Sequence, residues 1–189
     1  MIKKIGIFLL FLPAAMLVAG LFGIIHDEIS YSVSSEYFTK FKFIQFRLLD
    51  TNLPDRFRAG EVGFLASWWM GIPLGILCGL AAFIQRSPSL MRRALIMSLP
   101  VIATFTLAIA LAGLAYGWCR TGTIDLVGYR GWFIPPDANE LRRFLCAGYM
   151  HNAAYLGGAL SVPAAWLFHL VFRARNSKQP TSTSSPMRP

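Results

Sequence analysis

Four long apolar runs dominate the pattern of hydrophobic and polar positions along this chain. They cover residues 5–25, 62–84, 96–118 and 147–172, and none of them contains Asp, Glu, Lys or Arg. A helix needs about 20 apolar residues to cross the hydrocarbon core of a bilayer, and each run reaches that length. The pattern therefore predicts an all-α membrane protein with four transmembrane helices in one domain, residues 1–172.

Composition supports this prediction and argues against a soluble domain. The chain of 189 residues is 55% hydrophobic, with a mean hydropathy of +0.51. That proportion leaves no polar face for soluble helices or strands. Residues 173–189 differ because they are rich in Ser, Thr and Pro with scattered bases. They are predicted to form a disordered cytoplasmic tail, since they have little apolar area to bury.

Charge orients the predicted helices. All nine acidic residues lie in the connections 26–61 and 119–146, which are close to neutral. The net charge of +9 therefore belongs to the N-terminal segment, the connection 85–95 and the tail. Basic short loops stay cytoplasmic, so both termini and residues 85–95 are predicted inside and the two long connections outside. Attraction to anionic lipids explains the charge without any nucleic-acid partner.

The first run could be an uncleaved signal-anchor or a cleaved secretory signal. A basic start and a stretch ending near Ala19 and Gly20 are typical of a signal peptide. The run is longer than the about 7–15 apolar residues of a signal peptide, which favours an anchor that remains as the first helix.

Cysteine placement allows a disulfide outside the membrane. Cys119 and Cys146 bracket the connection 119–146, so both thiols would lie on one face in an oxidising compartment. They could form a disulfide that closes this connection, or they could be two unrelated interfacial cysteines. Cys78 lies inside the second run and is interpreted as a packing residue.

Small residues recur every four positions in two runs, as Gly71, Gly75 and Gly79 and then as Ala153, Gly157 and Ser161. This spacing places small side chains on one helix face and allows close approach of a neighbouring backbone. It predicts a compact bundle, and it is also compatible with a homo-oligomer. Each run contains one proline, and a kink is expected most clearly at Pro73.

The first long connection is predicted to contain local structure. Alternation around Ile29, Tyr31 and Val33 predicts a short extended piece. Ser34 is placed to N-cap a helix in which Glu36 and Lys40 pair four residues apart. This helix, over residues 35–49, has an apolar stripe formed by Tyr37, Phe41, Ile44 and Leu48. It could lie on the outer membrane interface or fold as an aromatic cap over the bundle.

The second long connection contains a helix-start signal. Asp137 followed by Glu140 resembles a capping box with Asp in place of the usual Ser or Thr. Helix four is therefore expected to begin near Ala138, before the fourth apolar run.

The candidate chemical site lies on the predicted outer face. His26, Asp27, Glu36 and His151 are candidate metal ligands, since imidazole nitrogen and carboxylate oxygen together bind zinc and similar ions. The candidates for catalysis or proton relay are His26, Glu36, His151 and Tyr155. The alternative is that these residues are ordinary interfacial polar groups and that His151 bonds a neighbouring helix. Their spacing matches no established ligand motif and identifies no cofactor; His169 is a weaker candidate.

Three segments resemble a group of uncharacterised bacterial four-helix inner-membrane proteins. They are residues 26–46 (HDEISYSVSSEYFTKFKFIQF), 68–71 (WWMG) and 151–158 (HNAAYLGG). The resemblance implies a multi-pass protein of the bacterial inner membrane and carries no known activity.

Three functional hypotheses follow. The first is a non-enzymatic accessory or structural protein that engages lipid or a partner subunit through its outer face. The second is a small enzyme or metal-binding protein that uses the His and carboxylate residues. The third is an oligomeric channel or carrier. The distance between His26 and His151 discriminates between the first two, because a site requires their rings to converge.

Overall fold

The computed structural model describes residues 1–49 and 52–177, and every regular element in those ranges is helical. Three spans are single helices, α1 (Ile2–Val33), α6 (Pro88–Arg120) and α7 (Leu141–Ser177). The other span consists of α4 (Asp55–Ser67), η2 (Trp68–Met70), α5 (Gly71–Gly79) and η3 (Leu80–Ile84). Within the described residues, four helical spans are long and apolar enough to cross a membrane, which confirms the prediction of a multi-span protein.

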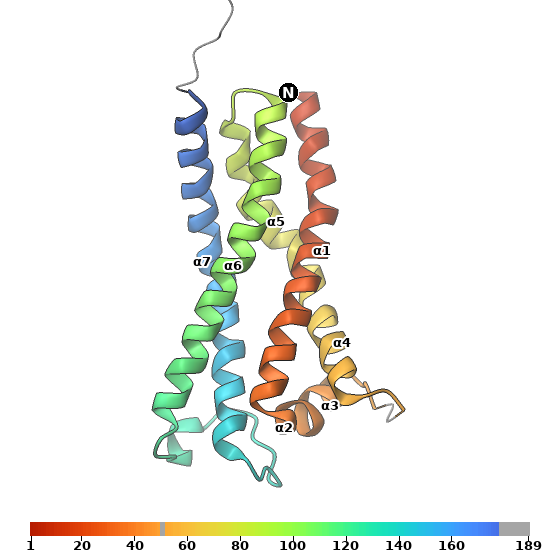
Figure 1. Ribbon diagram of the computed structural model, residues 1–189, viewed down its shortest axis with the longest axis vertical. Helices are drawn as coiled ribbons and strands as arrows, with labels where there is room; N and C mark the ends of the chain where they lie inside the picture. Colours follow the sequence, from red (N-terminus) through yellow and green to blue (C-terminus); the bar gives the residue numbers. More distant parts are fainter. Residues whose placement is uncertain (50–51, 178–189) are drawn as a thin grey trace, which may run out of the picture.

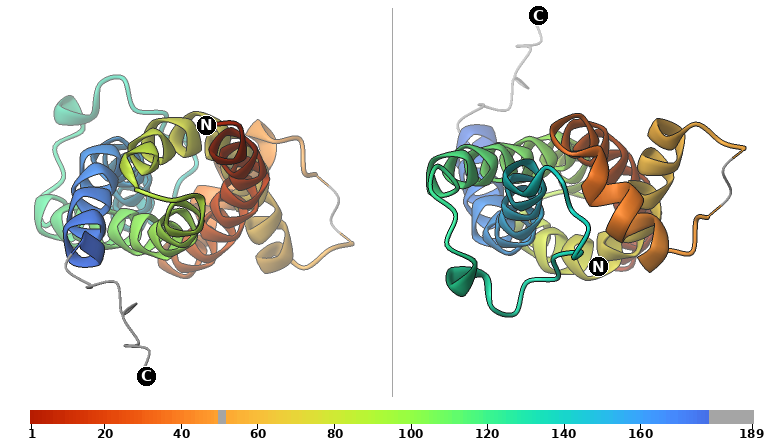
Figure 2. Two further views of the ribbon diagram at one scale, coloured as in Figure 1. Left: turned by 90° about the horizontal axis from the view of Figure 1, so that it is seen from above. Right: turned by 90° about the horizontal axis from the view of Figure 1, so that it is seen from below.

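The spans form an antiparallel bundle in which neighbours close into a ring (Figures 1 and 2). α1 contacts α6, α6 contacts α7, α7 contacts α5, and α5 contacts α1, while α4 packs along α1. Both long connections lie at one end of the bundle, here called the connection end (Figure 1). The N-terminus, the end of α7 and the turn before α6 lie at the other end, here called the terminal end.

α1 is longer than the apolar run that predicted it. It continues as a helix to Val33, so the extended piece predicted around Tyr31 is wrong. Ser30 is fully buried in this stretch, and packing of that face outweighs the strand preference of alternating residues. The helix stops at Ser34, whose extended backbone lets its hydroxyl accept a hydrogen bond from the Tyr37 amide at 3.2 Å. The predicted N-cap at Ser34 is confirmed.

Three short helical pieces follow α1, namely α2 (Ser35–Tyr37), the π-helical turn η1 (Phe38–Lys42) and α3 (Phe43–Gln45). In η1 the amide of Phe43 donates to the carbonyl of Phe38, five positions earlier. Phe38 and Phe43 are both buried in a cluster with residues of α4 and α7. The predicted stripe assumed α-helical spacing and is wrong at Ile44, which is exposed. The buried side chains of this segment pack against α4 and α7.

The second span is irregular around its proline. Pro73 has no amide hydrogen to donate to the carbonyl of Trp69, and the chain forms the 3-10 turn η2 just before it. The other three spans continue as α-helix through Pro13, Pro100 and Pro163. The irregular turn therefore lies next to Pro73, where the clearest kink was expected.

The glycines at four-residue spacing in α5 face α1. A Cβ at Gly71 would overlap the Met16 backbone, and one at Gly75 would lie 3.0 Å from the Ala15 Cβ. Gly79 faces Phe8 and Phe11 of α1. Gly157 in α7 faces α6, where its added Cβ would lie 3.0 Å from the Thr106 carbonyl oxygen. These positions allow neighbouring spans to approach at backbone distance.

At the terminal end, the turn before α6 is shorter than predicted, and α7 is longer than predicted. The connection predicted over 85–95 is a tight turn, because Ser87 N-caps α6 by accepting from the Leu90 amide and Pro88 occupies the first helical position. Residues 173–177 continue α7, so the prediction of disorder is wrong there. Arg173 helps to hold this turn by donating to the Ile84 carbonyl at 2.7 Å. The remainder of the predicted tail, 178–189, lies outside the described residues.

The three cysteines are free thiols. Cys119 is exposed at the end of α6, whereas Cys146 is buried in α7 with its sulfur 3.4 Å from the Thr121 hydroxyl. Of the two alternatives for this pair, the structure has two separate thiols and no Cys119–Cys146 disulfide, because Cys119 is exposed and Cys146 is buried. Cys78 is buried between α5 and α7, near Ser161.

Candidate functional site

His26 of α1 and His151 of α7 converge inside the bundle. Their ring centroids lie 4.6 Å apart in an edge-to-face arrangement, although the residues are far apart in the sequence. Both side chains are buried. A metal or catalytic site formed by these two histidines requires their rings to lie close together, and they do.

Asp27 and Ser30 complete this cluster. The Nδ1 of His26 lies 2.8 Å from the Oδ1 of Asp27, and the Nε2 of His151 lies 3.8 Å from the same oxygen. The hydroxyl of Ser30 lies 3.0 Å from the Nε2 of His151. His26 and Ser30 are four residues apart and so share one face of α1. We call His26, Asp27, Ser30 and His151 the polar cluster.

Two atoms of the polar cluster have unused bonding capacity. The Nε2 of His26 and the Oδ2 of Asp27 are buried without a hydrogen-bond partner in the described part of the chain. An unsatisfied buried polar group costs about 1–3 kcal/mol. Orphaned polar atoms are uncommon in folded proteins, and here two of them belong to adjacent residues.

The first connection forms the wall of the polar cluster at the connection end. The ring of Tyr37 stacks on that of His151, with centroids 4.8 Å apart and an angle of 27°. Tyr37 also contacts Phe144, at 5.0 Å between ring centroids, and Phe38 lies behind it. These aromatic side chains shield the polar cluster on this side. Burial in this wall raises the pKa of the Tyr37 hydroxyl.

Lys42 is a cation close to this site that the sequence reasoning missed. It ends the π-helical turn η1 and is buried, with its ammonium donating to the Gln45 side chain at 3.1 Å and lying 4.9 Å from the Phe41 ring centroid. Burial lowers its pKa, and the negative charge of Asp27 partly opposes that shift. A signal was present in the sequence, because Lys42 lies between Phe41 and Phe43 in an aromatic segment. Ser30 was missed as well, since it was assigned to an extended piece.

The polar cluster borders a partly open cavity of about 530 Å³ between the spanning helices. The polar lining at one end comes from His26, Asp27, His151, Lys42 and Tyr155. Most of the remaining lining is apolar and comes from α1, α5, α6 and α7, reaching as far as Phe11 and Leu99. The cavity is therefore amphipathic, with its polar end towards the connection end.

Tyr155 belongs to this site only as a lining residue. It lies one helical turn beyond His151 in α7, yet 66% of its surface is exposed. In the described part of the chain its hydroxyl forms no hydrogen bond with the polar cluster.

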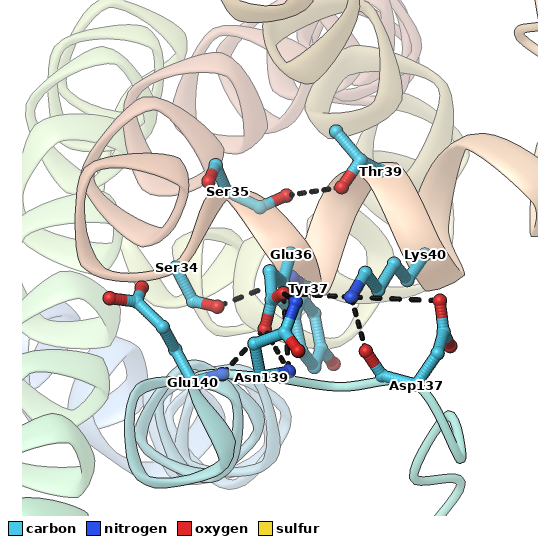
Figure 3. Close-up of polar contacts among 9 residues, drawn as sticks. All are labelled: Ser34, Ser35, Glu36, Tyr37, Thr39, Lys40, Asp137, Asn139 and Glu140. Carbon is cyan, nitrogen blue, oxygen red and sulfur yellow. Dashed lines mark hydrogen bonds and ion pairs between the residues drawn. The ribbon is translucent and has the colours of Figure 1, made fainter.

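Glu36 lies outside the polar cluster and has a structural role. Its carboxylate accepts hydrogen bonds from the amides of Asn139 and Glu140, at 3.0 and 2.8 Å, just before α7 begins (Figure 3). The predicted ion pair with Lys40 is confirmed at 2.8 Å, and Lys40 also donates to the Asp137 carbonyl. Asp137 was predicted to cap this helix near Ala138. That is wrong, because α7 begins at Leu141, and the amides of Asn139 and Glu140 just before it donate to Glu36 of the first connection.

The environment of Glu36 favours its ionised form. The ammonium of Lys40 and the amide of Glu140 donate to it and lower its pKa from 4.5 to about 2. A carboxylate at a helix N-terminus is also stabilised by the helix dipole. Glu36 therefore links the two long connections electrostatically.

Replacing Glu36 by Gln should lower the stability of the folded protein by about 1 kcal/mol at neutral pH, because the hydrogen bonds from Lys40 and the two amides lose their charge assistance. The contribution of a lowered pKa is complete above the unfolded value, 4.5, and is lost as pH falls towards about 2. The stability difference between the wild type and Glu36→Gln should therefore shrink across that window. Thermal unfolding in detergent at several pH values measures it.

Glu140→Gln is the matched control. Glu140 pairs with Arg143 at 3.4 Å, both side chains are about half exposed, and such pairs contribute little. Equal losses for the two variants, or a difference that persists at low pH, would contradict the stabilising role of the Glu36 carboxylate.

His169 lies alone towards the terminal end. It is fully buried in α7, and neither ring nitrogen has a hydrogen-bond partner among the described residues. Its carbonyl accepts from the Gln85 side chain at 3.0 Å. No acidic residue, cysteine or second histidine forms a ligand group with it in residues 1–49 and 52–177.

Comparison with known proteins adds no assignment. No family model, curated protein or solved structure matches this chain. Its function is therefore inferred from side-chain geometry and from the place of the polar cluster in the bundle.

Proposed function

We propose that this chain is an integral protein of the bacterial inner membrane that binds an amphipathic lipid within its helix bundle. The observation that carries the proposal is the amphipathic cavity of about 530 Å³. The apolar part of the ligand lies among the spanning helices, and its head group lies against the polar cluster and Lys42.

The size and lining of the cavity favour such a ligand. Small-molecule sites have volumes of about 300–1,000 Å³ and combine a mostly apolar lining with a few polar groups that orient the ligand. Inside a bilayer the abundant molecules with one polar end and a long apolar body are membrane lipids. The polar end offers histidine nitrogens, a carboxylate and an ammonium, which suit a head group that forms hydrogen bonds.

The orientation of the protein is part of this proposal. The terminal end carries Lys3, Lys4, Arg86, Arg92, Arg93, Arg173 and Arg175 and no acidic residue among the described positions. The positive-inside rule favours placing this end in the cytoplasm. The connection end then faces outward, and the polar cluster lies towards the outer leaflet.

The test is to fill the cavity and measure the lipid that copurifies. Ala103 of α6 lines the cavity, so Ala103→Trp should reduce bound lipid by at least about tenfold, since a difference of about 1.4 kcal/mol in binding suffices. Protein purified in mild detergent is extracted with solvent, and lipids are quantified by mass spectrometry. Phospholipid and isoprenoid quinone are measured separately, which identifies the lipid class.

Ala108→Trp supplies the control, because Ala108 lies on the same helix and is exposed. It should retain lipid at the wild-type level. Both variants must elute as folded species in size-exclusion chromatography, with Ala103→Leu as a milder replacement. A wild-type protein without stoichiometric lipid, or equal retention in the two tryptophan variants, would refute the proposal.

A further inference from the structure

We propose that His26, Asp27 and His151 bind one divalent transition-metal ion, with Zn²⁺ as the best fit. The site would leave one coordination position for water or for a group in the cavity. This inference does not rest on lipid binding, because it needs only the three side chains.

The geometry of the three residues suits a metal ion. One possible ligand atom from each residue lies within 4.8 Å of the other two. Zinc bonds of about 2.0–2.2 Å in a tetrahedral arrangement place ligand atoms roughly 3.3 Å apart. The distances from Asp27 Oδ1 to His26 Nδ1 and His151 Nε2, 2.8 and 3.8 Å, lie on either side of that value. Small movements would therefore form the coordination sphere.

The ligand types select the class of ion. Two imidazoles and one carboxylate suit zinc and other first-row transition metals, whereas Mg²⁺ and Ca²⁺ prefer oxygen ligands. Three protein ligands with one open position are typical of catalytic zinc sites, whereas structural sites use four. Because these residues also border the cavity, the open position is accessible from it.

Two buried polar atoms without a hydrogen-bond partner also support a metal site in this cluster. The Nε2 of His26 and the Oδ2 of Asp27 are at least nine-tenths buried and have no protein partner among the described residues. Two unpaired polar atoms on adjacent buried residues therefore favour a further group bound in this cluster.

The charge near this site sets the expected strength of binding. Asp27 is the only carboxylate in the ligand group, and the ammonium of Lys42 lines the same end of the cavity. A second cation repels a divalent ion in a low-dielectric environment. We therefore expect micromolar affinity for Zn²⁺, weaker than that of a structural zinc site.

The experiment measures Zn²⁺ binding to full-length protein in detergent. The protein carries no polyhistidine tag, and Cys119→Ser is the background, because Cys119 is the exposed thiol. Competition with a chromophoric chelator gives affinity, and elemental analysis gives stoichiometry. One ion per chain is expected, with affinity reduced at least about tenfold in Asp27→Asn and in His151→Gln.

His169→Gln is the matched control, since it removes another buried histidine from α7. It should leave zinc affinity unchanged. Zinc should also raise the melting temperature of the background protein and of His169→Gln, but not that of Asp27→Asn. Co²⁺ replacing Zn²⁺ should give the visible absorption of a tetrahedral nitrogen–oxygen site, which verifies the geometry independently of stability.

Two outcomes would overturn the metal site. One is the absence of stoichiometric zinc in the background protein, and the other is equal zinc affinity in Asp27→Asn and His169→Gln. Ala103→Trp separates this inference from the lipid proposal, because it should lose lipid and keep zinc. Loss of zinc with full lipid retention in Asp27→Asn would identify the metal site as separate from lipid binding.

Discussion

Gly23→Ala is expected to destabilise the bundle strongly, because α1 and α4 approach at backbone distance at this point. A Cβ on Gly23 would overlap the carbonyl oxygen of Gly63, and a Cβ on Gly63 would overlap the carbonyl oxygen of Gly23. Backbone atoms cannot move aside as a flexible side chain can, so the two helices must separate. Overpacking costs about 1–3 kcal/mol, and we expect a loss at or above the upper limit.

The matched control is Gly6→Ala on the same helix. A Cβ on Gly6 has no neighbour within 4 Å. Alanine favours helix formation over glycine by about 1 kcal/mol, so Gly6→Ala should be neutral or stabilising. The two substitutions are chemically identical, and only Gly23→Ala should lower the melting temperature in detergent. A neutral Gly23→Ala would show that α1 and α4 are not in contact there.

This contact also supports the polar cluster. A Cβ on Gly63 would lie 3.0 Å from the Cβ of Asp27, so α4 packs against the residue that joins the two histidines. Separating α1 from α4 should therefore disturb Asp27 as well as the stability of the bundle. Zinc affinity of Gly23→Ala should fall even at temperatures where the variant remains folded.

A membrane-impermeant maleimide should label Cys119 from one side of the membrane only. Cys119 is exposed at the connection end, whereas Cys78 and Cys146 are buried. If the connection end faces outward, spheroplasts should be labelled and inside-out vesicles should not be labelled until detergent is added. The readout is the mass shift of the purified chain.

Two variants complete the labelling experiment. Cys119→Ser should abolish the signal and so establish that the buried thiols do not react. Ala174→Cys, introduced in that background, places a thiol at an exposed position of the terminal end. It should react only in inside-out vesicles. Labelling with the opposite sidedness would reverse the proposed orientation, and labelling from both sides would contradict a single topology.

The spans of this protein could be predicted from its sequence because they depend on composition. A run without charged residues is favourable in hydrocarbon wherever its neighbours lie, and a helix satisfies its own backbone groups. Ser34, the pair of Glu36 with Lys40 and the irregularity at Pro73 are local effects within a few residues, so they could be predicted as well.

Other features depended on contacts between distant residues. The π-helical turn placed Phe38 and Phe43 on one face, and no α-helical or strand period predicts that arrangement. The amide of Glu140, just before α7, donates to Glu36 from another connection, so the local capping signal at Asp137 was misleading. Gly23 and Gly63 do not belong to the spacing pattern that drew attention to Gly71, Gly75 and Gly79.

The sequence alone determined that four apolar segments are helical and long enough to span a membrane, because transfer into hydrocarbon depends on the residues of each segment. It also supplied His26, Asp27 and His151 as candidates. Only the tertiary structure decided that these three meet beside Ser30 and Lys42 while Glu36 lies elsewhere. Helix rotation and pairing set those distances, and they depend on close packing between residues far apart in the chain.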